Sequence, residues 1–277
     1  MITANSFAKI NLFLHVINKR DDAYHNISTL MTKIDLHDTI VIEPSSYFKI
    51  YSNFSDIPLD DNNIMFKVYQ KVQQNYKIDP VIIKLYKKIP WGAGLGGGSS
   101  NAATFLYMLN ILYKLNLTYD DKYNILKEVG SDTVFFLRDS KTVYAEGRGE
   151  ILYDGPDIPK LQLLLVKPPF PVSTKEAYNG VKLRLTKKFN IDNIARFWNY
   201  NELLSKMEND FETTVFEKYP ELERIKRFML SLGADKALMS GSGSTIYGIY
   251  SNYDNLCKSY RFFKQYNNLY VTKTNTI

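Results

Sequence analysis

The stretch from Lys88 to Ala103 has the residue types and the spacing best suited to chemistry in this chain. It holds five glycines within seven positions, Gly92, Gly94, Gly96, Gly97 and Gly98. Glycine carries no Cβ, so such a loop can adopt positive φ angles and let an anion approach its backbone N–H groups. The pattern therefore predicts a phosphate-binding loop. A flexible turn is the structural alternative, but a turn rarely needs so many glycines.

The elements on either side of this loop would position it. A β-branched, alternating run from Val81 to Ile89 predicts a strand before the loop, and apolar spacing from Ala102 to Leu112 predicts a helix after it. The helix would direct its positive dipole end at a bound phosphate. Ser99 and Ser100 fall where the helix begins. They could cap it, or place hydroxyl groups on a phosphate or on a phosphate-bound Mg²⁺.

Two other classes of phosphate loop must be weighed against this pattern. No lysine follows the last glycine, so the loop is not of the Walker type. Gly92, Gly94 and Gly97 do satisfy G-x-G-x-x-G, which keeps a dinucleotide-binding oxidoreductase open as an alternative. The strand before the loop is lysine-rich and ends in Pro90, whereas a central parallel strand is almost wholly apolar.

Composition limits the partners of the chain. Its 277 residues, 45% of them hydrophobic, can bury one large core or two ordinary ones. A net charge of +6 suits a nucleotide or a nucleic acid, but the lysines are dispersed, so we expect a solvated surface and no nucleic-acid partner. One cysteine, no signal peptide and no membrane-length apolar run predict a cytoplasmic protein without a membrane partner. Monomer and homodimer both stay open.

Several further elements can be predicted. Residues 6–17 and 161–166 predict strands, and residues 38–43 with 48–51 predict a β-hairpin across Pro44. Helices are expected after a cap in the Asp60–Asn63 cluster, over residues 119–129, and from Pro220. Residues 182–201 are rich in Lys and Asn and predict a loop or short helix. A composition shift near Gly155 predicts two domains, residues 1–155 and 156–277.

Two charged residues stand out within apolar segments. Lys9 shares one strand face with Asn11, where an edge or snorkelling lysine is the structural alternative. Asp132 interrupts the apolar segment 130–137. It would either cap a helix at solvent or lie in a partly dry pocket, and only the second environment would tune its titration for catalysis.

These segments resemble a known family. Residues 90–103 resemble the phosphate loop of the GHMP kinases, the superfamily of galactokinase, homoserine kinase, mevalonate kinase and phosphomevalonate kinase. The sequence Gly-Leu-Gly-Gly-Gly-Ser-Ser at 94–100 is similar to one branch, the 4-diphosphocytidyl-2-C-methyl-D-erythritol kinases. Ala-Lys-Ile-Asn-Leu at 8–12, Tyr24-His25 and Ser173-Thr174 point to the same branch, and residues 240–244 resemble the superfamily's third motif.

The resemblance implies roles for individual residues. Lys9 would lie beside Asp132, the catalytic base. ATP phosphates would bind to Gly92, Ala93, Gly94, Leu95, Gly96, Gly97, Gly98, Ser99, Ser100 and Asn101. Adenine would contact Asn63 and Ile64. The acceptor substrate would contact Asn11, Tyr24, His25, Thr174 and Tyr178, with Tyr24 and Tyr178 on opposite faces of cytosine. The third-motif loop would comprise Ser240, Gly241, Ser242 and Gly243, and would close on the glycine loop.

The implied fold is α+β, the two-lobed GHMP kinase fold, with a ribosomal-S5-like N-terminal domain and a ferredoxin-like C-terminal domain. The implied reaction is ATP-dependent phosphorylation of the 2-hydroxyl of 4-diphosphocytidyl-2-C-methyl-D-erythritol in the non-mevalonate isoprenoid pathway, with Mg²⁺ accompanying ATP and no protein metal ligand assigned. Homoserine and mevalonate kinases are the nearest alternatives. The sequence departs from the family pattern at Ala23, where glycine is usual, and at Thr133-Val134, where Val-Pro is usual.

Overall fold

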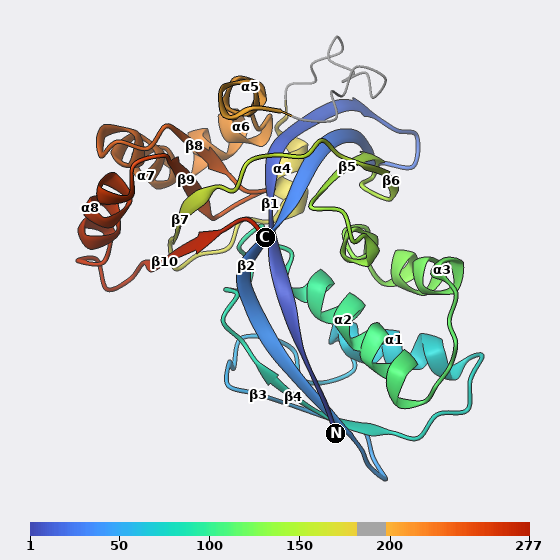
Figure 1. Cartoon of the computed structure of the whole chain (residues 1–277). Helices are drawn as coiled ribbons and strands as arrows, with labels where there is room; N and C mark the ends of the chain where they lie inside the picture. Colours follow the sequence, from blue (N-terminus) through green and yellow to red (C-terminus); the bar gives the residue numbers. More distant parts are fainter. Residues whose placement is uncertain (182–197) are drawn as a thin grey trace. The chain divides into compact units, whose positions relative to one another are not determined.

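The protein, studied as a computed structural model, is described for residues 1–181 and 198–277 (Figure 1). It forms two compact units, each assembled from three segments of the chain. The first unit comprises Met1–Ala8, Leu36–Trp91 and Gly96–Asp139, and the second comprises Lys9–Asp35, Gly92–Leu95 and Ser140–Ile277. The units thus divide the chain differently from the family domains expected at 1–155 and 156–277, which stay a prediction.

Two long strands contribute residues to both units. β1 (Ile2–Lys19) pairs with β2 (His25–Pro44), and both are rich in β-branched and aromatic residues (Figure 1). The strand expected over residues 6–17 is therefore confirmed, and it is longer than predicted.

In the first unit, the prediction that residues 38–43 and 48–51 pair as a β-hairpin is wrong. β4 (Val81–Tyr86) pairs antiparallel with the end of β2 and parallel with β3 (Lys49–Ser52), so it lies between the two strands that were expected to pair. Burial explains the order. β4 buries three residues on one face, Val81, Ile83 and Leu85, whereas β3 buries Ile50 alone. The more apolar strand takes the central position, and the shorter one takes the edge.

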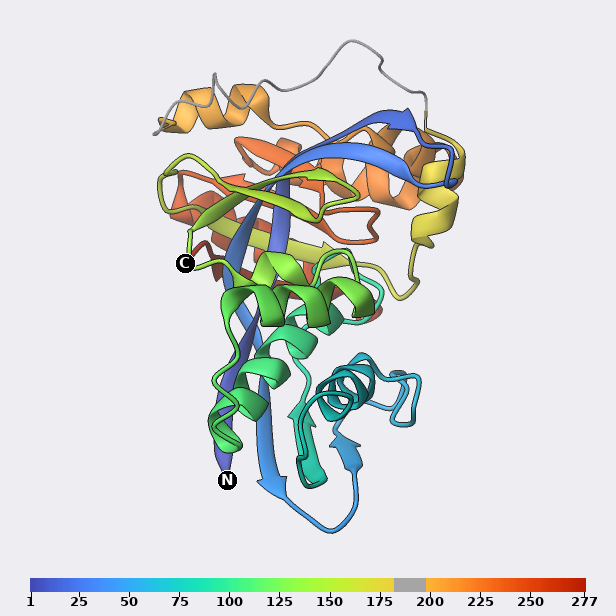
Figure 2. The ribbon, with the colours of Figure 1, turned by 90° about the vertical axis from the view of Figure 1, so that its right-hand side faces the viewer.

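Helices complete the first unit. α1 (Ile64–Gln73), α2 (Gly97–Leu112) and α3 (Tyr119–Val129) pack together with the 3-10 turn η1 (Val134–Leu137), as Figures 1 and 2 show. Asn63 caps α1 by accepting from the Met65 N–H, as the Asp60–Asn63 cluster predicted. α3 has the predicted bounds because Thr118 and Asp121 form a capping box.

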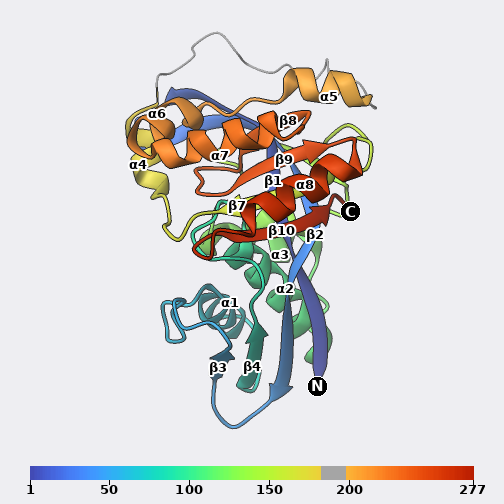
Figure 3. The same cartoon turned by 90° about the vertical axis from the view of Figure 1, so that its left-hand side faces the viewer.

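The second unit contains a four-stranded antiparallel sheet in the order β10-β7-β9-β8. Its strands are β7 (Gln162–Lys167), β8 (Lys236–Met239), β9 (Ile246–Tyr250) and β10 (Tyr270–Asn275). α7 (Pro220–Ser231) is the last helix of the connection from β7 to β8, and α8 (Tyr253–Phe263) connects β9 to β10. Both helices cover one face of the sheet (Figure 3). This β-α-β-β-α-β order is the ferredoxin-like topology that was expected.

The remaining elements of the second unit are smaller. β5 (Thr142–Gly147) pairs with β2 and with β6 (Ile151–Asp154). Three short helices follow, α4 (Thr174–Asn179), α5 (Tyr200–Lys206) and α6 (Phe211–Lys218). The prediction for residues 182–201 falls mostly on 182–197, which lie outside the described residues. Among the helices described, none combines the length and the apolarity needed to cross a membrane.

Candidate active site

The glycine loop adopts the backbone that its composition predicts. Gly92, Gly94 and Gly96 have φ angles of 62°, 73° and 69°, the left-handed region that favours glycine. α2 begins at Gly97, with Gly96 as its N-cap and no side-chain cap. Of the two roles left open for Ser99 and Ser100, capping is therefore excluded, because the helix begins two residues before Ser99.

Three successive carbonyl groups fix the first half of the loop within the second unit. The Ala93 oxygen accepts from the Thr245 N–H (3.3 Å), the Gly94 oxygen from the Ser240 hydroxyl (2.9 Å), and the Leu95 oxygen from the Lys9 N–H (3.0 Å). In a planar trans peptide the N–H points opposite to the C=O. The N–H groups that follow these carbonyls therefore point away from the residues that hold the loop.

These N–H groups are available for an anion. Over the residues that the structure describes, no N–H from Gly92 to Ser99 donates to a protein acceptor. Gly98 adds a second indication. A Cβ built there would meet no atom within 4 Å, so the protein's own packing does not require glycine at this position. A run of unpaired donors at a helix N-terminus is the arrangement that binds phosphate.

Lys9 and Asn11 lie next to this loop in the second unit. Both are buried, and Lys9 Nζ donates to Asn11 Oδ1 (2.6 Å), so Lys9 is not a lysine that only reaches solvent. Asn11 Nδ2 donates to Thr29 Oγ1 (2.8 Å), and the Tyr247 hydroxyl donates to the Asn11 carbonyl (2.7 Å). Burial raises the pKa of Tyr247 well above its usual value, which keeps this hydroxyl a donor.

The third-motif loop packs against the same residues. A Cβ at Gly94 would lie 2.0 Å from the Ser240 carbonyl oxygen, and one at Gly241 would lie 3.3 Å from the Gly94 oxygen and 3.5 Å from Asn11 Oδ1. At Gly94 only glycine permits such an approach. Three segments that the sequence singled out separately therefore meet within the second unit: residues 9–11, residues 93–95 and residues 240–241.

Asp132 is half-buried in the first unit. The next residue, Thr133, is buried, and its hydroxyl donates to the carbonyls of Leu126 (2.7 Å) and Gly130 (2.6 Å). η1 follows without a side-chain cap, so Asp132 is not a helix cap. Thr133 thus anchors the turn that carries the acid, at the place where the family pattern has Val-Pro. The pairing of Asp132 with Lys9 stays a prediction.

Asn63 and Ile64 stand at the start of α1. The Asn63 side chain is engaged as the cap and also donates to the Pro58 carbonyl (2.6 Å). Its contact with adenine stays a prediction.

The residues expected to hold the acceptor substrate lie in the second unit. The rings of His25 and Tyr178 stack with centroids 4.8 Å apart, and the Arg148 guanidinium lies 4.5 Å from the ring centroid of the exposed Tyr24. Burial, then the charge of Lys19, lowers the pKa of His25 below its usual 6.5. The placement of cytosine between Tyr24 and Tyr178 stays a prediction.

Two details of these segments bear on the family pattern. Ala23 has a φ of 66°, so it adopts in this chain the left-handed conformation that glycine would adopt more easily. The turn nevertheless closes, since the Arg20 N–H donates to the Tyr24 carbonyl (2.8 Å). Thr174 Oγ1 lies 3.1 Å from Ser242 Oγ, which joins the Ser-Thr segment to the third-motif loop.

Comparison with known proteins agrees with this geometry. Residues 63–139 match the GHMP kinases N terminal domain and residues 190–266 match the GHMP kinases C terminal domain. The 4-diphosphocytidyl-2-C-methyl-D-erythritol kinase of Thermodesulfovibrio yellowstonii is 40% identical over 275 residues, covering 96% of this chain and 95% of the relative. The enzyme of the same name from Thermoanaerobacter pseudethanolicus is 38% identical, covering 99% and 96%. The chain belongs to the 4-diphosphocytidyl-2-C-methyl-D-erythritol kinase family.

Solved structures share the fold of this chain. A crystal structure of 4-(cytidine 5'-diphospho)-2C-methyl-D-erythritol kinase is 28% identical over the full length of both chains, with a TM-score of 0.82. A homoserine kinase from Cytophaga hutchinsonii, 17% identical, has a TM-score of 0.72 over 99% of this chain and 94% of its own. The second likeness shows the shared fold alone. The predicted α+β GHMP kinase fold is confirmed.

Sequence reasoning missed one residue that supports the site of this kinase. Asn209 Nδ2 donates to the carbonyls of Met239 (2.7 Å) and Gly241 (2.8 Å), at the third-motif loop. The next residue, Asp210, accepts from the Val16 N–H (2.9 Å) in β1. The available signal was a polar run, Glu208-Asn209-Asp210, set between the apolar residues Met207 and Phe211.

A buried lysine was also missed. Lys167 Nζ donates to the carbonyls of Pro168 (2.8 Å) and Phe170 (3.4 Å), and burial lowers the pKa of this amine. Ser244 Oγ donates to the same Phe170 oxygen (2.6 Å). Together these bonds fix the proline-rich segment that leads to Thr174. A lysine at the end of an apolar strand gave no signal of this role.

Proposed function

We propose that this chain transfers the γ-phosphoryl group of ATP to the 2-hydroxyl of 4-diphosphocytidyl-2-C-methyl-D-erythritol, giving the 2-phosphate and ADP in the non-mevalonate route to isoprenoid precursors. The observation that carries the proposal is the meeting of Lys9 and Asn11, the loop carbonyls of residues 93–95, and the third-motif loop. The chain that carries these residues is 40% identical to a 4-diphosphocytidyl-2-C-methyl-D-erythritol kinase.

The loop would bind the phosphates of ATP through backbone groups. The N–H groups from Gly92 to Ser99 supply donors, and the N-terminus of α2 supplies a favourable dipole. The open space beside Gly98 suits the approach of phosphate oxygens to the backbone. Mg²⁺ bound with ATP would neutralise charge on the phosphates.

Asp132 and Lys9 would carry the chemistry on the protein side. Asp132 would accept the proton of the 2-hydroxyl, while Lys9 would orient that carboxylate and keep it ionised. Phosphoryl transfer passes through a loose transition state, so the base has little covalent work and positioning supplies most of the acceleration. The Asn11 bond to Lys9 Nζ favours such positioning, because it fixes the direction of the amine.

The nucleotide part of the acceptor would bind beside Tyr24, His25 and Tyr178. An exposed tyrosine ring is a stacking surface for a base, worth about 1–3 kcal/mol per base by analogy with other base–aromatic contacts. Neutral His25 can both donate and accept a hydrogen bond, as reading the polar edge of cytosine requires. Arg148, which lies over the Tyr24 ring, adds a cation that would favour binding of the acceptor's diphosphate.

ATP consumption against a panel of acceptor alcohols tests the proposal. The panel contains 4-diphosphocytidyl-2-C-methyl-D-erythritol, mevalonate, homoserine and galactose. We expect turnover with the first and at least about a hundredfold lower kcat/KM with the others, since only the first offers a nucleobase and a diphosphate. Faster turnover of mevalonate or homoserine would overturn the acceptor, and NADH binding without ATP binding would overturn the kinase.

A further inference from the structure

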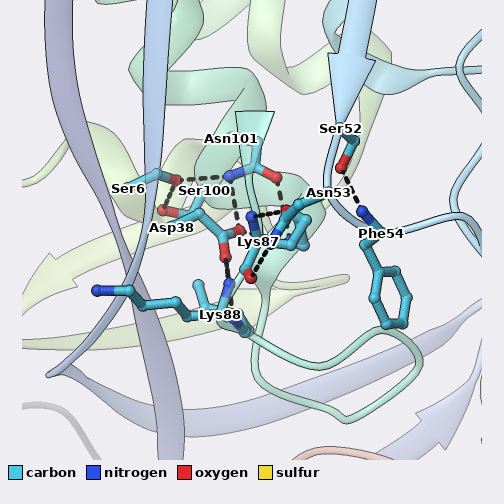
Figure 4. A network of polar contacts seen from close by, with 10 residues as sticks. Ser6, Asp38, Ser52, Asn53, Phe54, Lys87, Lys88, Ser100 and Asn101 are labelled. Carbon is cyan, nitrogen blue, oxygen red and sulfur yellow. Dashed lines mark hydrogen bonds and ion pairs between the residues drawn. The ribbon is translucent and has the colours of Figure 1, made fainter. Parts of the chain in front are cut away.

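A fully buried carboxylate organises the polar network of the first unit. Asp38, near the end of β2, has no exposed surface and accepts hydrogen bonds from four donors (Figure 4). Its Oδ1 accepts from the N–H groups of Lys88 (2.8 Å) and Ile89 (2.9 Å), and its Oδ2 accepts from Lys87 Nζ and from Asn101 Nδ2 (3.0 Å).

The four donors come from both ends of the glycine loop. Lys88 and Ile89 precede the loop, and Asn101 stands in the first turns of α2, after it. Oδ1 of Asp38 therefore holds the entry of the loop, and Oδ2 joins Lys87, on the entry side, to Asn101 at the exit. The contact is close, because a Cβ at Gly97 would lie 2.9 Å from the Ile89 side chain and 3.3 Å from Lys87 Nζ.

Neighbouring side chains complete both connections. Asn101 Oδ1 accepts from Lys87 Nζ (3.3 Å), and Asn101 Nδ2 also donates to Ser6 Oγ (2.9 Å). The Ser6 hydroxyl donates to Ser100 Oγ (2.7 Å). On the entry side, the Asn53 amide binds both the N–H (2.7 Å) and the carbonyl (3.3 Å) of Lys87, as Figure 4 shows.

This network also bears on two of the residues expected to bind phosphate. Ser100 and Asn101 are buried, and their side chains are engaged with Ser6, Lys87 and Asp38. A buried polar group with all its partners inside the protein contributes to rigidity, not to direct ligand contact. Direct phosphate binding by these two residues stays a prediction, and the backbone of the first turn of α2 is the better candidate.

We propose that Asp38 is a positioning residue for ATP binding: by joining Lys88 and Ile89 to Asn101, its carboxylate sets the first turn of α2 relative to the strand that leads into the glycine loop. The inference rests on the proposed function, since it presumes that the phosphates of ATP lie on that turn. Loop donors act at short range, so a small displacement of the helix start weakens every phosphate contact together.

Asp38→Asn tests the proposal, because asparagine keeps the shape and the Oδ1 acceptor but turns Oδ2 into a donor. That donor would oppose the Lys87 ammonium and the Asn101 amide. We expect ATP with Mg²⁺ to bind about tenfold more weakly in calorimetric titration, the loss of one charged hydrogen bond, whereas KM for the acceptor alcohol changes less than about twofold. ATP affinity equal to that of the unmodified chain would overturn the proposal.

The exchange Asp38→Asn with Asn101→Asp provides a rescue. It restores one carboxylate for Lys87 Nζ and reverses the donor and acceptor between positions 38 and 101, so we expect ATP affinity within about threefold of the original.

Val72→Ala is the matched control: it removes buried apolar volume from α1 in the same unit, away from the network, and should lower thermal stability without changing ATP affinity. If Val72→Ala weakens ATP binding as much as Asp38→Asn does, the effect of Asp38→Asn reflects a general loss of stability, and the positioning role of Asp38 is overturned.

Two further outcomes distinguish a failure of the Asp38 role from a failure of the proposed function. If Asp38→Asn does not fold, Asn101→Ala removes the contact of Asp38 at the loop exit, together with the Asn101 bonds to Lys87 and Ser6. Normal ATP affinity in that variant contradicts the proposal. If the unmodified chain binds ATP but phosphorylates none of the tested alcohols, the proposed acceptor is wrong, while the ATP affinities of the variants still decide the role of Asp38.

Discussion

Lys9 is a buried lysine whose amine is held by an amide oxygen instead of reaching water. Burying a charge costs free energy unless other groups compensate for it, so such residues concentrate where a reaction needs them. Its backbone N–H also holds the Leu95 carbonyl of the glycine loop. One residue therefore fixes the loop and presents a cation close to it, which supports the assignment of Lys9 to the chemistry.

Asp132→Asn should lower kcat by at least about a hundredfold, the usual contribution of a general base, with little change in the binding of ATP or of the acceptor. The amide keeps the size of the side chain but cannot take the hydroxyl proton. Asp139→Asn, an exposed acid seven positions further along the chain, is the matched control and should retain full turnover. Near-normal turnover of Asp132→Asn would remove this residue from the role of base.

His25 should titrate below pH 6.5, because burial and the charge of Lys19 lower its pKa. The unfolded chain then binds this proton more tightly than the folded chain, so the contribution of His25 to stability is complete above pH 6.5 and is lost as the pH falls through the folded pKa. NMR titration of the histidine ring signals, with His25→Gln to assign the resonance, measures the midpoint. A midpoint at or above 6.5 would contradict the prediction.

At the scale of the elements, Gly94 and Gly98 differ in the space that their surroundings leave for a side chain. A Cβ at Gly94 would collide with the Ser240 carbonyl, at a φ that only glycine adopts easily. A Cβ at Gly98 would meet nothing, and a glycine in a helix costs up to about 1 kcal/mol relative to alanine. Packing therefore explains the first glycine and does not explain the second, which is consistent with a ligand at Gly98.

Gly98→Ala should leave the melting temperature unchanged or slightly raised, and yet weaken ATP binding about tenfold, because the new methyl group would occupy space that phosphate oxygens need. Gly94→Ala should instead lower the melting temperature by several degrees. Differential scanning fluorimetry with and without ATP separates the two effects. Unchanged ATP affinity in Gly98→Ala would place the phosphates elsewhere.

Local signals in the sequence predicted elements better than they predicted pairings. The bounds of α3 follow from the Thr118 cap and an amphipathic spacing, both of which lie within residues 118–129. The hairpin failed because its outcome depended on β4, which lies more than thirty residues beyond β2 in the chain and offers a more apolar face. Strand order is decided by burial between distant segments, which no local pattern contains.

The candidate site shows the same contrast between local signals, which the sequence contains, and contacts between distant segments, which it does not. Glycine spacing was sufficient to predict the loop, whereas Lys9 and Asp132 stood out only as charged residues in apolar segments, and the family resemblance gave them catalytic roles. Asp38 and Asn209 were missed because their partners are backbone groups far along the chain, such as the Ile89 N–H and the Gly241 carbonyl. A residue that acts by holding another segment has no neighbour in sequence that reveals its role.

At the scale of the whole molecule, the second unit is not a continuous C-terminal domain. Its hydrophobic core contains Leu14, Val16 and Ile27 together with residues of β7, α7, β9 and α8. β1 also joins it through its backbone, since the Leu14 N–H donates to the Glu208 carbonyl (2.9 Å) and the Leu14 carbonyl accepts from the Asp210 N–H (3.0 Å). The N-terminal strands are therefore part of the unit that carries the ferredoxin-like sheet.

A fragment of residues 156–277 should consequently fail to fold cooperatively. It lacks three core side chains, each worth about 1.5–3 kcal/mol of burial, a loss comparable with the whole stability of a typical domain of about 5–15 kcal/mol. Thermal unfolding followed by near-ultraviolet circular dichroism should show no sharp transition for this fragment, whereas co-expression with residues 1–155 should restore one. The full chain is the reference. A fragment that melts sharply within a few degrees of the full chain would mean that the core is complete without β1 and β2, and that the boundary near residue 155 divides two independent folding units.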